Sequence, residues 1–314
     1  MNQFLSINDV ANPQQLVKDA LALKNNPLGY AQLGKNKTLG LLFFNASLRT
    51  RLSTQRAAQN LGMDVMVMNM SNEGWQLEFE ENVIMNGTPA EHIKEAAAVI
   101  SQYCDIIGIR TFSGLVNREE DYNEKALNAF VANATVPIVS LESATLHPLQ
   151  SLTDWVTIEE YKKVDKPKVV LTWAPHPKAL PQAVANSFVQ WIKNAPVELV
   201  VTHPQGYELA PQFSDGITIE YNQDKAFENA DFVYAKNWSS YTDYGKIGSQ
   251  KNDWMITEEK MKLTNNGAFM HCLPVRRNMV VSDSVLDNGN SLVIKQAENR
   301  IYTAQAVLKS ILEG

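Results

Sequence analysis

Short β-rich runs alternate along the whole chain with segments of helical periodicity, and this alternation is typical of an α/β fold. The runs lie at residues 38–44, 64–70, 105–112 and 136–141, and again at 168–173, 197–202, 217–221, 230–235, 268–273 and 291–294. Helical patterns occupy residues 50–60, 91–103, 154–163 and 297–312. Because the series restarts after residues 154–163, and because 314 residues with 45% hydrophobic content can fill two cores, we predict two doubly wound α/β domains with parallel sheets.

Charge and cysteine content argue against several classes of protein. The formal net charge of -6 opposes binding to nucleic acid or to an anionic membrane surface. The cysteines, Cys104 and Cys272, are far apart, which argues against a disulfide framework and fits a reducing cytoplasm. The histidines lack metal-ligand spacing, so no metal is expected. The chain begins without a signal-like segment and has no long apolar run, so we expect a protein that is neither exported nor membrane-spanning.

The strongest local signal is the run LLFFNASLRTR at residues 41–51, where an apolar strand meets the start of a helix. Such a junction presents backbone N–H groups to an anion, and Ser47, Arg49 and Thr50 can add hydroxyl and guanidinium donors. Ser47 could instead only cap the helix. Capping does not need two arginines beside the cap, so the run favours a phosphate site.

Three further segments place polar side chains after strand-like runs. Arg110 ends DIIGIR, at the sheet edge where open α/β folds bind ligands. HPLQ offers His147 and Gln150 to a carbonyl and an amide, although Pro148 alone would make a turn there. FMHCLPVRR at residues 269–277 could be only a buried cysteine followed by a solvated arginine pair.

Taken together, SLRTR, HPLQ and HCLP resemble the signatures of the aspartate and ornithine transcarbamylases, in the same order and across nearly the whole chain. The cysteine in HCLP points to the ornithine side of that family. The resemblance implies a carbamoyl-phosphate-binding domain at residues 1–146 and an acceptor-binding domain at 147–314, with the last helix, about 297–314, packing back on the first. It also implies a homotrimer with shared active sites, in which Trp75 reaches into a neighbouring subunit, and no cofactor.

The chain departs from ordinary ornithine transcarbamylases at residues 235–248, which read AKNWSSYTDYGKIG and lack the Ser-Met-Gly loop that holds a free amino acid. An acylated nitrogen carries no charge to be paired. This departure, with Trp75 and the runs TWAPHP and YAKNW, resembles the acylornithine transcarbamylases. That branch implies that the acylornithine contacts Glu142, His176, Lys236, Arg276, Cys272, Leu273 and Ala90.

The nature of the acyl group depends on two positions. In the acetylornithine branch a glutamate lies ahead of the Glu-His pair and a lysine follows HCLP, whereas this chain has Ala90 and Val280 there. Without the glutamate, a succinyl carboxylate meets less like-charge repulsion. The resemblance therefore favours N-succinylornithine as the acceptor, with N-acetylornithine as the alternative.

By the same resemblance, Thr50, Arg110 and His147 stabilise the charge that develops during transfer. The carbamoyl-phosphate-binding residues are then Ser47, Leu48, Arg49, Thr50, Trp75, Arg110, His147, Gln150, Cys272, Leu273 and Arg300. Because transfer can be direct, Cys272 is expected to contact substrate without acting as a nucleophile. We expect replacement of Arg110 by leucine to abolish activity and leave the fold largely intact.

Two other classes remain as alternatives. A nucleotide-dependent dehydrogenase is disfavoured because no G-x-G-x-x-G follows the first strand of either domain. A catalytically inactive, carbamoyl-phosphate-binding regulatory paralogue would not need to keep Arg49, Arg110, His147 and Arg276 together.

Overall fold

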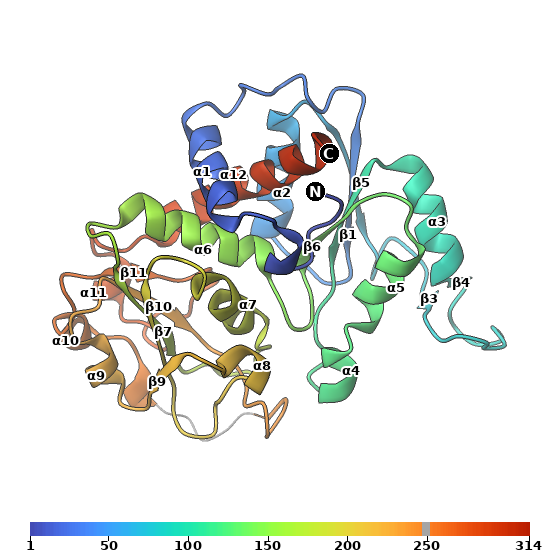
Figure 1. Cartoon of the computed structure of the whole chain (residues 1–314). Helices are drawn as coiled ribbons and strands as arrows, with labels where there is room; N and C mark the ends of the chain where they lie inside the picture. The colour runs from blue at the N-terminus through green and yellow to red at the C-terminus, as the bar shows by residue number, and fades with distance from the viewer. Residues whose placement is uncertain (247–251) are drawn as a thin grey trace. The chain divides into compact units, whose positions relative to one another are not determined.

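Two α/β units make up the chain in a computed structural model that describes residues 1–246 and 252–314 (Figure 1). Unit 1 contains Met1–Gly114, Glu119–Leu149 and Arg300–Gly314. Unit 2 contains Leu115–Arg118 and Gln150–Asn299. The boundaries therefore fall inside two helices, α6 (Pro148–Tyr161) and α12 (Val293–Leu312).

Unit 1 is built on a four-stranded parallel sheet in the order β2-β1-β5-β6. Its strands are β1 (Thr38–Phe43), β2 (Asp64–Asn69), β5 (Ile106–Arg110) and β6 (Ile138–Glu142), and a separate ribbon pairs β3 (Leu77–Glu78) with β4 (Glu91–His92). Its helices are η1 (Ile7–Asp9), α1 (Pro13–Asn25), α2 (Arg49–Asn60), α3 (Ile93–Tyr103), α4 (Arg118–Tyr122, whose first residue belongs to unit 2) and α5 (Lys125–Asn133). Helices α1 and α2 lie on one face of the sheet, and α3 and α5 cover the other (Figure 1). Both faces of the central strands are therefore buried, which explains their near-continuous apolar sequence.

The register of the unit 1 sheet brings the carboxyl ends of three strands together. Phe43 of β1 is level with Arg110 of β5, and Arg110 is level with Glu142 of β6 across a local irregularity. Residues that follow β1 therefore start beside the Arg110 side chain. Helix α2 runs back from this edge and ends at Asn60. Gly62, two residues further on, has a φ of 82° that suits glycine, and a Cβ there would lie 2.2 Å from the Ala31 carbonyl oxygen.

Unit 2 has a five-stranded parallel sheet in the order β11-β10-β7-β8-β9. The strands are β7 (Lys168–Trp173), β8 (Glu198–Thr202), β9 (Thr218–Glu220), β10 (Phe232–Lys236) and β11 (Ala268–Met270). The shorter helices are α7 (Ala183–Ile192), α8 (Pro211–Ser214), α9 (Gln223–Phe227), η2 (Asn252–Trp254), α10 (Glu258–Met261) and α11 (Asp283–Leu286). Its core gathers side chains such as Val170, Val233, Phe227 and Phe269.

The prediction of two α/β units with parallel sheets is confirmed, but one predicted strand is wrong. Residues 291–294 do not form a strand: Ser291 makes a single bridge to Phe269, and α12 already begins at Val293. Buried Val293, Gln296 and Arg300 continue the helical spacing of α12. Burial on that helix face overrides the β-propensity of the local apolar residues.

Two predicted helices also have different starts. Helix α6 begins at Pro148, not near residue 154, so HPLQ enters the first helical turn, where proline is well tolerated. Residues 91 and 92 belong to β4 before α3 starts.

Among the described residues, no helix combines the length and the apolar character needed to span a bilayer.

Candidate functional site

The turn after β1 leads directly into α2 without a side-chain cap. Leu48 is the N-cap residue of α2 and makes no side-chain capping hydrogen bond, so Ser47 does not fill the capping role considered above. Leu48 is largely exposed, whereas Ser47 and Arg49 are half-buried. The first turn of α2 thus presents its N-terminal end, with Arg49 and Thr50, at the same sheet edge as Arg110.

Two guanidinium groups converge on the buried hydroxyl of Thr50. Arg110 donates through Nη1 to Thr50 Oγ1 at 3.3 Å, and Arg300 of α12 donates through Nη2 to the same oxygen at 2.6 Å. Arg110 also donates through Nε to Asn45 Oδ1 at 3.1 Å. Concentrating two cations beside a helix N-terminus in a largely buried position favours binding of an anion.

A buried carboxylate organises the other side of Arg110. Glu142 forms an ion pair with Arg110 Nη1, and the same oxygen, Oε2, lies 3.7 Å from His147 Nε2. The side chains of Arg110, Glu142 and His147 are only 11%, 8% and 5% exposed, so solvent screens these charges weakly. The structure therefore brings Thr50, Arg110, Glu142, His147 and Arg300 into one cluster of unit 1.

Trp75 and Ala90 lie elsewhere in unit 1, on the ribbon formed by β3 and β4. The indole Nε1 of Trp75 donates to Glu91 Oε2 at 2.8 Å, and Ala90 N donates to the Gln76 carbonyl at 3.0 Å. Trp75 is 62% exposed. Within the described part of this chain, no contact joins Trp75 to the Thr50 cluster.

Unit 2 carries a second group of predicted residues at the ends of β7 and β10. Arg276 donates through Nε to His176 Nε2 at 3.1 Å, and His176 Nδ1 lies 3.0 Å from the Lys178 carbonyl. Lys178 N lies 3.1 Å from the same Nδ1. Because the Arg276 N–H can only donate, Nε2 accepts from it, as a neutral imidazole can. Burial lowers the pKa of His176, and the charges of Lys236 and Arg276 lower it further. The cluster holds cations around a neutral histidine, an arrangement suited to carboxylate ligands.

The HCLP loop of unit 2 rests on a buried hydrogen-bond network. Asp154 Oδ1 accepts from Gln150 Nε2 at 2.7 Å and from Gln296 Nε2 at 2.6 Å, and Gln296 Oε1 accepts from His271 N at 3.0 Å. Burial raises the pKa of Tyr234 well above its usual range, with further contributions from Asp154 and Cys272.

The loop itself has an unusual backbone. Leu273 has a φ of 57°, a left-handed conformation that is rare for a branched side chain, and a cis peptide bond joins it to Pro274. Its N–H donates to His271 Nδ1 at 2.9 Å. Cys272 is a half-buried free thiol beside this turn.

Two residues near the predicted motifs have different environments. Arg277, the second arginine after HCLP, forms surface ion pairs with Asp283 and Asp287, so it serves the local fold. Val280 is only 2% exposed and belongs to the hydrophobic core of unit 2. Of the predicted 235–248 segment, residues 247 and 248 lie outside the described residues.

Residues that the sequence did not single out also support the site. Asn45 lay within the quoted LLFFNASLRTR run, so its position beside Ser47 was a usable signal. Asp154 lies four residues after Gln150, the helical spacing that brings the two side chains together. Glu124 accepts from Thr145 N at 2.7 Å, in the segment before His147, and it had no such signal because it is distant in sequence from every predicted motif.

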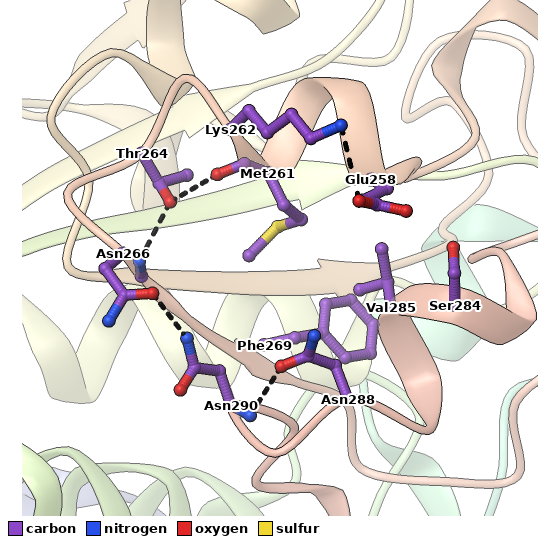
Figure 2. Close-up of a pocket in the computed structure, with 11 residues that line it drawn as sticks. Glu258, Met261, Lys262, Thr264, Asn266, Phe269, Ser284, Val285, Asn288 and Asn290 are labelled. Atoms are coloured by element: carbon purple, nitrogen blue, oxygen red, sulfur yellow. Dashed lines mark hydrogen bonds and ion pairs between the residues drawn. The ribbon is translucent and has the colours of Figure 1, made fainter.

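A cavity of about 360 Å³ in unit 2 is unrelated to these groups (Figure 2). It lies among α10, β11 and α11, and its lining residues in the described chain include none of the predicted site residues. Asn290 Nδ2 donates to Asn266 Oδ1, and Lys262 pairs with Glu258, so these polar groups satisfy one another (Figure 2). Over residues 1–246 and 252–314, no group of three or more His, Cys, Asp or Glu side chains is placed to hold a metal ion.

Comparison with known proteins defines the class to which this site belongs. Residues 2–160 match the aspartate/ornithine carbamoyltransferase carbamoyl-P binding domain, and residues 181–311 match the Asp/Orn binding domain of the same family. The chain belongs to the aspartate/ornithine carbamoyltransferase family, and it is a carbamoyltransferase.

Individual relatives place the chain among acylornithine enzymes. It is 51% identical to the N-succinylornithine carbamoyltransferase of Bacteroides thetaiotaomicron, an alignment that covers 100% of this chain and 99% of the relative. A crystal structure of acetylornithine transcarbamylase complexed with acetylcitrulline superposes with a TM-score of 0.94 at 33% identity, covering 99% of both chains. A Glu-to-Ala mutant of N-acetyl-L-ornithine transcarbamylase, complexed with carbamyl phosphate and N-succinyl-L-norvaline, gives a TM-score of 0.93 at 33% identity, covering 99% of this chain and 100% of that one. The predicted transcarbamylase-like fold is confirmed.

Proposed function

We propose that the protein transfers the carbamoyl group of carbamoyl phosphate to the δ-amine of N-succinyl-L-ornithine. The products are N-succinyl-L-citrulline and inorganic phosphate, and the reaction is a step of arginine biosynthesis. The observation that carries the acceptor assignment is the full-length identity of 51% to an N-succinylornithine carbamoyltransferase, against 33% to the structurally similar acetylornithine enzyme.

The phosphate of carbamoyl phosphate is assigned to the first turn of α2. Ser47, Leu48, Arg49 and Thr50 supply backbone and side-chain donors, and Arg110 adds a second guanidinium. We further assign Arg300 to this site because it donates to Thr50 Oγ1, and Gln150, Cys272 and Leu273 of unit 2 to the carbamoyl end. Trp75 is assigned to the active site of a neighbouring subunit.

Carbamoyl transfer needs a neutral amine and a stabilised carbonyl oxygen. The δ-amine has a free pKa of about 10, so it must lose one proton before attack, and the second proton that the nitrogen releases after the C–N bond forms can go to the departing phosphate. Attack forms the C–N bond and breaks the bond from the carbamoyl carbon to the phosphate oxygen. The negative charge that builds on the carbonyl oxygen is stabilised by Thr50, Arg110 and His147, donors that the fold already holds in place.

The acylornithine is assigned to the cationic cluster of unit 2. N-Succinylornithine carries two carboxylates, which Lys236 and Arg276 can pair while neutral His176 holds the Arg276 guanidinium. Glu142, Cys272 and Leu273 are assigned to the same ligand. The Glu142 carboxylate lies between Arg110 and His147, and we assign its contact with the ligand to that position.

Ala90 supports succinyl over acetyl specificity. A carboxylate at this position would repel the succinyl carboxylate, and the small, neutral alanine removes that repulsion. A Glu-to-Ala mutant of the related N-acetyl-L-ornithine transcarbamylase is complexed with N-succinyl-L-norvaline, so a site of this kind that lacks one glutamate is compatible with a succinyl ligand. Val280 gives no comparable support, because it is buried in the core.

We also propose that residues 1–146 form the carbamoyl-phosphate domain and residues 147–314 the acylornithine domain, with the last helix, about 297–314, packing back on the first, and that the chains assemble as a homotrimer. An apolar cavity of about 340 Å³ in unit 1 is lined by Met68, Trp75 and Tyr103 among others, and these side chains are 41%, 62% and 63% exposed. A second copy of the chain would cover them.

The free thiols of Cys104 and Cys272 fit a cytoplasmic location.

Formation of the citrulline or N-acylcitrulline product by the purified protein tests the proposal. With carbamoyl phosphate present, N-succinylornithine should give the highest kcat/KM, N-acetylornithine a lower one and ornithine almost none. Preferential turnover of ornithine would contradict the acyl assignment, and carbamoyl phosphate binding without any turnover would indicate a regulatory paralogue. Light scattering of the same sample should give the mass of three chains.

A further inference from the structure

Glu124 lies outside every motif discussed above, yet its carboxylate is bonded to the loop that joins Glu142 to His147. Oε1 accepts from Ser143 Oγ at 2.6 Å, from Thr145 N at 2.7 Å and from Thr145 Oγ1 at 2.5 Å. Oε2 accepts from Ala144 N at 3.1 Å. One carboxylate therefore holds three consecutive residues of a loop that begins and ends at a site residue.

The backbone conformation of Glu124 is energetically unfavourable. Glu124 precedes α5 with φ 48° and ψ 39°, a left-handed conformation that is unfavourable for a residue with a Cβ. Its side chain makes no capping hydrogen bond to α5, although it occupies the N-cap position. The side chain is instead directed to the loop, so neither backbone preference nor helix capping accounts for a glutamate at this position.

The loop sets the positions of two groups that act on the carbamoyl end of the substrate. Glu142 lies just before it and pairs with Arg110, while His147 lies just after its closing turn, which Ser143 N forms with the Leu146 carbonyl at 2.8 Å. His147 Nε2 lies 3.7 Å from Glu142 Oε2. A shift of the loop would move His147 relative to Arg110.

We infer that Glu124 is a positioning residue for carbamoyl transfer, which fixes the 143–145 loop and thereby sets the geometry of Glu142 and His147. The inference rests on the proposed function. No contact between Glu124 and substrate is part of the proposed role. Its carboxylate acts through the loop, and its effect should fall on kcat because His147 stabilises charge that exists only in the transition state.

Glu124→Gln and Glu124→Gly test the inference in complementary ways. In Glu124→Gln either orientation of the amide turns its NH2 toward one of the two backbone N–H groups of Ala144 and Thr145, so one bond is lost. Glu124→Gly removes the whole carboxylate but relieves the left-handed backbone, which favours folding. The matched control is Glu95→Gln, because Glu95 is an exposed residue of α3 in the same unit.

We expect both Glu124 variants to lose roughly tenfold or more in kcat, since misplacement by about 1 Å can cost two orders of magnitude. The KM for carbamoyl phosphate should change much less, Glu95→Gln should behave as wild type, and Glu124→Gly should unfold at close to the wild-type temperature. Hydrogen exchange of the peptide spanning residues 140–148 should be faster in both Glu124 variants.

Three outcomes would overturn the inference. Wild-type kcat in both Glu124 variants, while the wild-type protein turns over N-succinylornithine, would refute it and leave the proposed function intact. Unchanged exchange of residues 140–148 would refute the anchoring step whatever the activity. A wild-type protein without any turnover would refute the proposed function itself, and this inference with it.

Discussion

Removal of Arg110 should damage both catalysis and stability, because the structure pairs this residue with a buried carboxylate. Arg110→Leu leaves Glu142, whose side chain is 8% exposed, without its cationic partner. Breaking a buried ion pair by removing one member typically costs about 3–5 kcal/mol of unfolding free energy. The expectation from sequence, that the fold would remain largely intact, is therefore revised: we expect a loss of about 3 kcal/mol, near the lower limit because the pair is not fully enclosed.

The double variant separates the two effects. Arg110→Leu combined with Glu142→Leu removes both charges, and apolar replacement of a buried pair is often nearly neutral for stability. Urea denaturation should therefore show the double variant to be more stable than Arg110→Leu. Citrulline formation should fall by about two to three orders of magnitude in both, since a donor to the developing oxyanion is missing.

Two results would refute this reasoning. If the double variant were as unstable as Arg110→Leu, the cost would come from lost packing and not from the isolated charge of Glu142. If either variant kept near-normal kcat, Arg110 would have no role in the chemistry, whatever its effect on stability. Glu95→Gln provides the control for a charge lost from the surface of the same unit.

Other parts of the proposal can be tested in the same assays. Ala90→Glu should lower the succinyl-to-acetyl ratio of kcat/KM by about tenfold, equivalent to about 1.4 kcal/mol of like-charge repulsion, and an unchanged ratio would remove Ala90 as the basis of specificity. Thr50→Val removes the oxygen that accepts from two guanidiniums and should reduce kcat by about a hundredfold. Thr50→Ser keeps the hydroxyl and should keep most of the activity. Equal losses in the two variants would show that the hydroxyl is not the important group. Burial and the charges of Lys236 and Arg276 lower the pKa of His176 from its ordinary 6.5. The folded state therefore favours the neutral imidazole, and this contribution to stability is fully present above pH 6.5. It is lost as the pH falls from 6.5 toward the lower pKa of the folded state. Between about pH 7.5 and pH 5 the urea midpoint of His176→Asn should therefore fall less than that of the wild type, and an equal fall would contradict the assignment.

The sequence predicted most strands of both sheets because parallel strands that are buried on both faces have long apolar runs. β1, β5 and β7 are of this kind, and they lie within or coincide with the runs at residues 38–44, 105–112 and 168–173. The strand predicted at residues 291–294 was wrong because Val293 is buried as the first residue of α12, while Ile294 is 70% exposed on the same helix. The burial of Val293 follows from the packing of that helix, which the local sequence does not specify.

The candidate site was predictable where strand and helix ends concentrate polar residues, as they do at Thr50 and Arg110. A sheet edge forces such residues together once the strands pair, so their chemistry can be inferred before any coordinates. The interactions among them could not be inferred in this way. Arg300 reaches Thr50 across 250 residues of chain, and the pairing of Glu142 with Arg110 depends on the register between β5 and β6.

The sequence by itself therefore determined the class of fold and the family, and it predicted an anion site at the start of α2, because each depends on local patterns of apolar and polar residues. Only the tertiary structure decided which charged groups form ion pairs and which arginine after HCLP donates to His176. It also decided that Glu124 accepts hydrogen bonds from the loop before His147. These outcomes depend on distances between segments far apart in the chain. Those distances are set by packing of the whole unit, and no short stretch of sequence encodes them.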